Sequence, residues 1–171
     1  MNKITHAYYF AENAHKNQKR KYTNEPYIIH PLSVMNIVEE VTFDEDMLIA
    51  SLLHDVVEDT DYIIEDIENV FGFDVAELVD GLTDISLPED GNRAKRKEID
   101  RNHVVHGCYK VQTIKLADII DNTFSIVKQD KNFAKVYMKE KKLLLEVLTK
   151  GDIKLFDIAN KIVENYYKGI K

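Results

Sequence analysis

One dense group of side chains in this chain could do chemistry, the segment His54–Asp59, which reads His-Asp-Val-Val-Glu-Asp. No Lys or Arg stands near it in the chain to neutralise its three carboxylates. In a helix, side chains three and four residues apart meet, so His54 would lie above Glu58, and Asp55 near Asp59. Crowded carboxylates repel one another, which favours a bound cation or raised pKa values. A solvated acidic helix end explains the same pattern equally well.

Other polar residues lie close to apolar sequence, as a buried site would require. His30 follows an apolar stretch at a predicted helix start, although a single His there is more often structural than a ligand. Asp118 lies within the apolar run 114–120, where a carboxylate is costly unless it binds metal or pairs, for example with Lys115. Asn122 would face the same side of that helix. A mixed nitrogen and oxygen ligand set that suits Mn²⁺, Fe²⁺ or Zn²⁺ would consist of His30, His54, Asp55 and Asp118.

Two basic segments could attract anionic groups such as phosphates. They are residues 16–21, with four Lys or Arg, and residues 93–101, with five. Charged runs are more commonly solvated surface, so both interpretations stay open. Glycine-rich phosphate loops, GxSxG elbows and HExxH helices are absent from the sequence.

The elements that must position these residues are predicted to be helices, because apolar residues recur at three- and four-residue steps. Gly72 and Gly151 mark two helix ends, Asp44 and Asp74 are candidate N-caps, and residues 83–92 read as a loop. We therefore predict a single all-α domain over residues 1–171, a bundle of about eight or nine helices. The expected helices span 4–14, 31–41, 45–57, 63–71, 75–82, 93–106, 111–127, 133–148 and 153–167.

Composition excludes several classes of protein. The chain has 171 residues, 44% of them hydrophobic, which is enough for a core, while 3 Pro and 6 Gly are few for a β-sandwich. A net charge of −7 argues against binding a nucleic-acid polymer. Cys108 is the single cysteine, so neither an internal disulfide nor a Cys-rich metal site is expected. No signal peptide or membrane span is evident, so we expect a cytoplasmic protein without a membrane partner.

Taken in order, these residues resemble the HD-domain hydrolases of the RelA/SpoT homologue superfamily, which degrade the alarmones ppGpp and pppGpp. The resemblance covers about residues 14–125, and the chain length is most similar to the stand-alone small alarmone hydrolases. No single motif would identify the family, whereas the series of motifs in this order does. The series consists of Ala14-His15, Gln18, Arg20-Lys21, Pro26-Tyr27-Ile28, His30-Pro31, the segment 52–60, Phe71-Gly72, Leu82-Thr83-Asp84, Lys115-Leu116-Ala117-Asp118 and Asn122.

The resemblance implies a metal-dependent guanosine-3′,5′-bis(diphosphate) 3′-pyrophosphohydrolase. Its metal, typically one Mn²⁺ per site, would be bound by His30, His54, Asp55 and Asp118. The adjacent acids Glu58 and Asp59 would orient and deprotonate the attacking water. Hydrolysis of the alarmone's 3′-diphosphate would give GDP or GTP plus pyrophosphate.

The resemblance also implies contacts with the nucleotide. A basic pair would stack along the base, two polar residues would contact the ribose region, a second basic pair would bind the distal phosphates, and an aromatic residue would close the pocket. Arg20 and Lys21 would be the pair along the base, and Asn122 and Ser125 would contact the ribose region. Arg96 and Lys97 would bind the distal phosphates, and Tyr137 would be the aromatic residue that closes the pocket.

Three positions depart from the family pattern, namely Ile119, Asp121 and Tyr22. They would alter substrate preference more than metal binding, so an adenosine alarmone or a dinucleotide 3′-phosphate stays an alternative substrate. A different class of protein, a nucleotide-binding regulatory module without catalysis, is a further alternative. The C-terminal helices could also supply a face for a second copy of the chain.

Overall fold

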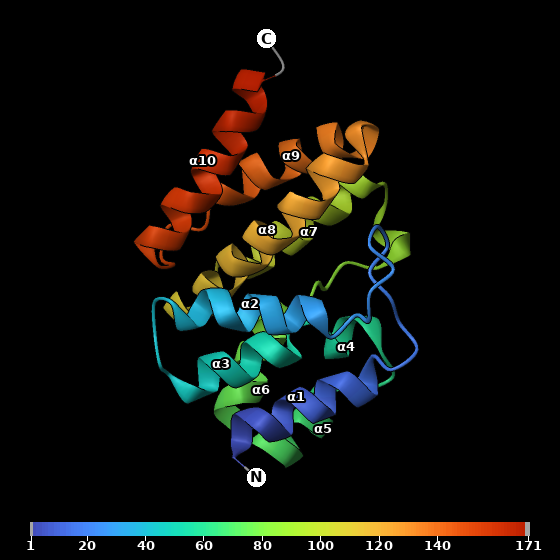
Figure 1. Cartoon of the computed structure of the whole chain (residues 1–171), viewed down its shortest axis with the longest axis vertical. Helices are drawn as coiled ribbons and strands as arrows, with labels where there is room; N and C mark the ends of the chain where they lie inside the picture. The colour runs from blue at the N-terminus through green and yellow to red at the C-terminus, as the bar shows by residue number, and fades with distance from the viewer. Residues whose placement is uncertain (1, 170–171) are drawn as a thin grey trace. The chain divides into compact units, whose positions relative to one another are not determined.

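The computed structural model describes residues 2–169, which form ten α-helices and one short 3₁₀ turn, with an isolated β-bridge between Lys19 and Pro26 (Figure 1). The predicted all-α class is therefore confirmed. The chain divides into two compact units, Met1–Thr83 and Asp84–Lys171, each described by itself below. None of the described helices combines the length and the hydropathy that a membrane span needs.

The first unit is built around α3, whose residues 47–53 are all buried. A helix that is apolar around its whole circumference has to be enclosed, and α3 packs against α1, α2 and α6. The Asp44 carboxylate caps α3 by accepting the backbone N–H of Met47 at 3.1 Å, as the sequence predicts. The elements are α1 (Lys3–Ala14), α2 (Ile29–Glu39), α3 (Glu45–Leu53), α4 (Val56–Asp59), α5 (Ile64–Phe71) and α6 (Phe73–Leu82).

The helix expected over residues 45–57 is interrupted, which corrects its predicted bounds. α3 ends at Leu53 with His54 as its C-cap, and α4 begins at Val56. The interruption places His54 and Asp55 at a junction between two helices. This junction lets neighbouring side chains converge in a way that one straight helix would not.

Gly72 sets the boundary between α5 and α6. Its φ of 95° lies in the region that favours glycine, and it both ends α5 and precedes the first residue of α6. Asp74, which the sequence predicts as the N-cap of α6, instead lies inside the first turn of that helix. Its carboxylate there still complements the positive end of the helix dipole.

The second unit is organised around α8, which packs against α9 and α10. Most of its buried residues are apolar, and Asp118 is buried among them. Gly151 allows a close approach before α10, since a Cβ there would lie 2.7 Å from Leu116 Cδ1. The elements are η1 (Pro88–Asp90), α7 (Arg93–Val104), α8 (Tyr109–Gln129), α9 (Lys131–Leu145) and α10 (Ile153–Gly169).

Candidate functional site

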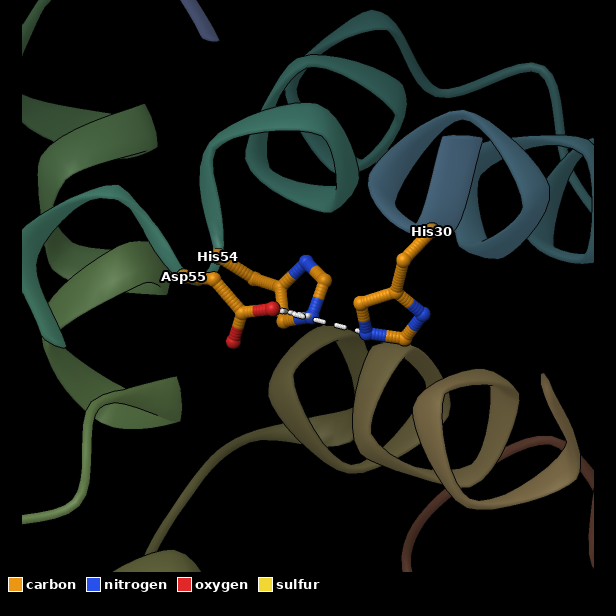
Figure 2. A group of neighbouring side chains, drawn as sticks. All are labelled: His30, His54 and Asp55. Atoms are coloured by element: carbon orange, nitrogen blue, oxygen red, sulfur yellow. Dashed lines mark ion pairs between the residues drawn. The ribbon is translucent and has the colours of Figure 1, made fainter. Parts of the chain in front are cut away.

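The first unit brings His30, His54 and Asp55 together, although α2 supplies one of them and the α3–α4 junction the other two (Figure 2). The Asp55 Oδ2 atom lies 3.4 Å from His30 Nε2 and 3.1 Å from His54 Nε2. Both imidazoles are almost completely buried, at 1% and 2% exposure. One ligand atom from each residue falls within 4.8 Å of the others, a spacing that can hold a metal ion.

The end of α3 orients the His54 ring. Its Nδ1 atom lies 2.8 Å from the carbonyl oxygen of Ser51, which can only accept a hydrogen bond. Nδ1 therefore carries a proton, and Nε2 is the ring nitrogen that faces Asp55. A carbonyl that fixes the tautomer in this way is typical of metal-binding histidines.

Tyr27 links the cluster to α4. Its hydroxyl lies 2.7 Å from Asp55 Oδ2 and 3.1 Å from Asp59 Oδ2, close enough to donate to either carboxylate. Burial, followed by the charges of Asp55 and Asp59, raises the pKa of the Tyr27 hydroxyl well above its ordinary value. Tyr27 therefore stays a protonated donor between the two acids.

Asp59 is held from a second direction by the segment that follows α1. The Gln18 Nε2 atom donates to the backbone oxygen of Asp59 at 2.6 Å, and Gln18 Oε1 lies 2.8 Å from Nδ1 of the buried His15. The His15 ring lies against the Tyr27 ring, with centroids 4.6 Å apart. Burial, and next the charge of Asp55, raises the pKa of the Asp59 carboxyl, and the Tyr27 hydrogen bond offsets part of that rise. This carboxyl is thus a better proton acceptor than an ordinary Asp.

Sequence reasoning left His15, Gln18 and Tyr27 without roles in this network, although all three occur in the ordered series. The local signals were two three-residue spacings, that of His15 and Gln18, whose side chains are in contact, and that of Tyr27 and His30, whose rings lie edge to face. Of the predicted residues nearby, Glu58 is exposed on α4. Arg20 is half-buried in the loop before α2.

Lys21 and Tyr22 lie in the same loop. The Lys21 ammonium sits 5.0 Å from the centroid of the Tyr22 ring. Tyr22, one of the three departures from the family pattern, is therefore in contact with a predicted base-binding residue.

The second unit holds Asp118 on α8 with partners from the same helix. Asn122 Nδ2 donates to Asp118 Oδ1 at 2.5 Å, and Lys115 Nζ lies 3.5 Å from Asp118 Oδ2. The ion pair with Lys115, one of the two interpretations of the sequence, is thus present. The Ser125 hydroxyl donates to the Asn122 carbonyl. Ile119, a departure from the family pattern, is buried in the core.

Other predicted contact residues of the second unit lie on α7 and α9. Lys97 forms an ion pair with Asp84, and Tyr137 is buried. Arg96 is half-buried, and its Nε atom has no hydrogen-bond partner among the described residues. Burial, followed by the Asp118 charge, raises the pKa of the Tyr137 hydroxyl above its ordinary value. Lys141, which the sequence did not single out, has a lowered pKa, chiefly because of burial and despite the attraction of Asp118.

Comparison with known proteins supports the resemblance found in the sequence. A family model described as the HD domain matches residues 7–144. A GTP pyrophosphokinase from Streptomyces coelicolor is 40% identical over 134 residues, 77% of this chain and 16% of that protein. The guanosine-3′,5′-bis(diphosphate) 3′-pyrophosphohydrolase MESH1 from Danio rerio is 42% identical over 118 residues, 66% of this chain and 63% of that protein.

A solved structure is similar over nearly the whole chain. It belongs to a metazoan orthologue of SpoT, described as hydrolysing ppGpp and playing a role in starvation responses. It has a TM-score of 0.87 and 30% sequence identity, covering 97% of this chain and 96% of that chain. This chain thus spans only part of the curated relatives, 16% of the first and 63% of the second, but nearly all of the solved one.

Proposed function

The chain belongs to the HD-domain family, and on that premise we propose that it is a metal-dependent hydrolase that removes the 3′-diphosphate from ppGpp and pppGpp. The names of the Danio rerio relative and of the metazoan structure support this substrate class. The proposal treats residues 1–171 as a single phosphohydrolase domain acting in the cytoplasm on a small nucleotide.

The observation that carries the proposal is the buried group of His30, His54 and Asp55. Two imidazole nitrogens and a carboxylate form a donor set that fits Mn²⁺, Fe²⁺ or Zn²⁺, and the contact of His54 Nδ1 with Ser51 leaves Nε2 as the nitrogen on the side of Asp55. We assign one Mn²⁺ to these three ligands, with Asp118 as the fourth. Asp118 supports the assignment because it is a buried carboxylate on α8, whose other buried residues are mostly apolar.

When bound, the metal would lower the pKa of a water molecule and polarise the phosphorus centre. Asp59 and Glu58 orient that water and accept its proton, and the raised pKa of Asp59 suits this role. The water oxygen forms a bond to the phosphorus attached to the ribose 3′ oxygen. The bond between that phosphorus and the 3′ oxygen breaks, pyrophosphate leaves, and the 3′ oxygen takes up a proton to give GDP or GTP.

The chain's own polar residues bind and orient the nucleotide. Arg20 and Lys21 lie along the base, and Asn122 with Ser125 contacts the ribose region. Arg96 and Lys97 bind the distal phosphates, and the unpartnered Nε of Arg96 supports its role. Tyr137 closes the pocket with its ring.

The test is a substrate panel with purified protein whose Mn²⁺ content has been measured. ppGpp should yield GDP and pyrophosphate, with a higher kcat/KM than an adenosine alarmone or a dinucleotide 3′-phosphate. A higher kcat/KM for one of those competitors would reassign the substrate and keep the chemistry. Binding of ppGpp to the metal-loaded protein without product would contradict the hydrolase and favour a regulatory module.

A further inference from the structure

The second unit contains a groove between α7 and α9, and Lys97 is the one residue of its lining that the proposed reaction also uses. Its volume is about 600 Å³. Its lining includes the apolar residues Ala94, Val136 and Leu143, and the last two are 47% and 38% exposed. Branched apolar side chains that stay exposed inside a concavity mark a place where a ligand would remove apolar surface from water. We call this feature the α7–α9 groove.

The lining of the α7–α9 groove also contains more cations than acids. Arg101, Lys135 and Lys139 line it, and none of the three forms an ion pair with an acidic residue in the described part of the chain. Within the described residues, the Arg101 guanidinium donates one hydrogen bond, to the Lys97 carbonyl at 3.5 Å, which is long. Three cations thus share the groove and repel one another.

Two other cations of the groove, Arg93 and Lys97, do form ion pairs with acidic residues. Arg93 on α7 donates to Glu140 on α9 from Nε at 2.7 Å and from Nη2 at 2.9 Å. Lys97 pairs with Asp84. Glu98, the other acid of the lining, pairs with Lys95 at 3.0 Å. The acids of the lining are therefore engaged with other cations, and Arg101, Lys135 and Lys139 stay available to an anion from solution.

The sequence concentrates positive charge on this unit. Residues 22–92 contain 19 Asp and Glu and no Lys or Arg, whereas residues 93–171 contain 18 Lys and Arg against 10 Asp and Glu. α7 contributes cations four residues apart at Arg93, Lys97 and Arg101, and it buries only Asp100 and Val104. A helix that is polar on nearly all sides adds little to a core, so its cationic face needs another explanation.

We propose that the α7–α9 groove binds a small anionic amphiphile, a molecule with a compact apolar body and one or two anionic groups. The apolar body would cover Val136 and Leu143, and the anionic groups would pair with Lys135, Lys139 and Arg101. The volume lies within the range of small-molecule sites, about 300–1,000 Å³. This proposal requires neither the metal nor alarmone hydrolysis.

The experiment uses 8-anilinonaphthalene-1-sulfonate as the probe, followed by fluorescence titration and by amide chemical shifts. We expect one saturable site per chain, with shifts at α7 and α9. The double variant K135E/K139E should weaken binding at least tenfold, and Val136→Asp should weaken it as well. The matched control K154E/K161E changes two exposed lysines of α10 and should bind like the wild type. The uncharged probe N-phenyl-1-naphthylamine should bind more weakly than the anionic one.

Equal affinity in K135E/K139E and in the wild type would overturn the proposal, as would shifts confined to other helices. The milder variant K135Q/K139Q, checked by its melting temperature, repeats the test if charge reversal impairs folding. Light scattering tests whether a second copy of the chain, rather than a small molecule, occupies the groove. A dimer that K135E/K139E dissociates would make the groove a contact between two copies of the chain and would refute the small-molecule site.

Discussion

Tyr27 shows how a single hydroxyl connects two functions. Its proton lies between Asp55, which belongs to the buried metal-binding cluster, and Asp59, which belongs to the proposed acid pair. A displacement of either carboxylate would therefore shift the Tyr27 hydroxyl and, through it, the other carboxylate. Tyr27 touches neither the water nor the nucleotide in the proposed reaction, so it acts as a positioning residue.

We predict that Tyr27→Phe weakens Mn²⁺ binding about tenfold or more, because groups that orient metal ligands typically contribute that much. Calorimetric titration with Mn²⁺ measures the affinity without relying on turnover. The control is Tyr8→Phe, which removes an exposed hydroxyl bonded to Glu12 and should bind Mn²⁺ like the wild type. Unchanged metal affinity in Tyr27→Phe would show that the hydroxyl has no positioning role.

The same residue shows where sequence reasoning stops. The contacts of Tyr27 with Asp55 and Asp59 join positions 28 and 32 residues apart, and no local pattern reports them. Residue type makes His54 and Asp55 candidates for a site, although the same residues fit a solvated acidic helix end. The type of Tyr27 indicates even less, because a tyrosine has many structural uses, so its role is visible only when its partners are known.

At the scale of elements, helical periodicity predicts that a helix is present better than it predicts where the helix ends. The pattern of α3 continues through Val56 and Val57, so the sequence predicts one helix where the structure has a junction. The junction depends on what packs around it, including the bond between the His54 ring and Ser51. α7 and α10, which follow the predicted loop 83–92 and the predicted helix end at Gly151, come close to the predicted ranges.

The contact before α10 yields a prediction about packing. A methyl group at Gly151 would lie 2.7 Å from Leu116 Cδ1 and 3.0 Å from the Gln112 backbone carbon, and the backbone cannot give way easily. Gly151→Ala should therefore lower the free energy of unfolding by about 1–3 kcal/mol, measured by urea denaturation. Gly169→Ala is the control, since nothing lies within 4 Å of its added Cβ. A loss no larger than in the control would contradict this tight contact.

The ion pair of Asp84 with Lys97 predicts a pH dependence. Burial alone would raise the pKa of the Asp84 carboxyl, but Lys115 and Lys97 outweigh it and lower the pKa below the ordinary 3.8. A lowered folded-state pKa contributes stability above the unfolded value and loses it as the pH falls through the folded value. Asp84→Asn should therefore cost about 1 kcal/mol at pH 7, a modest figure because solvent screens the partly exposed Lys97.

Urea denaturation at several pH values tests this prediction. The difference between wild type and Asp84→Asn should shrink as the pH drops below 3.8, because the wild-type carboxyl becomes neutral there too. The exposed Asp157→Asn of α10 serves as the control and should show no such convergence. A difference that stays constant down to low pH would assign the stabilisation to packing.

At the scale of the whole molecule, the proposed ligand set spans both compact units. His30, His54 and Asp55 belong to the first unit and Asp118 to the second. A ligand that binds only the folded state stabilises it by mass action, by about 2.7 kcal/mol at a hundred times its dissociation constant. If one ion is bound by residues of both units, it must stabilise both together.

Hydrogen exchange with and without Mn²⁺ tests that coupling. In the wild type, Mn²⁺ should slow exchange in α3 of the first unit and in α8 of the second. Asp118→Ala should weaken metal binding and abolish the Mn²⁺ effect in α8. Glu58→Ala is the matched control, because it removes a carboxylate assigned to the water, so it should keep the metal protection in both helices while losing most turnover. Full protection of α8 in Asp118→Ala, with wild-type Mn²⁺ affinity, would remove Asp118 from the ligand set and leave the metal to the first unit alone.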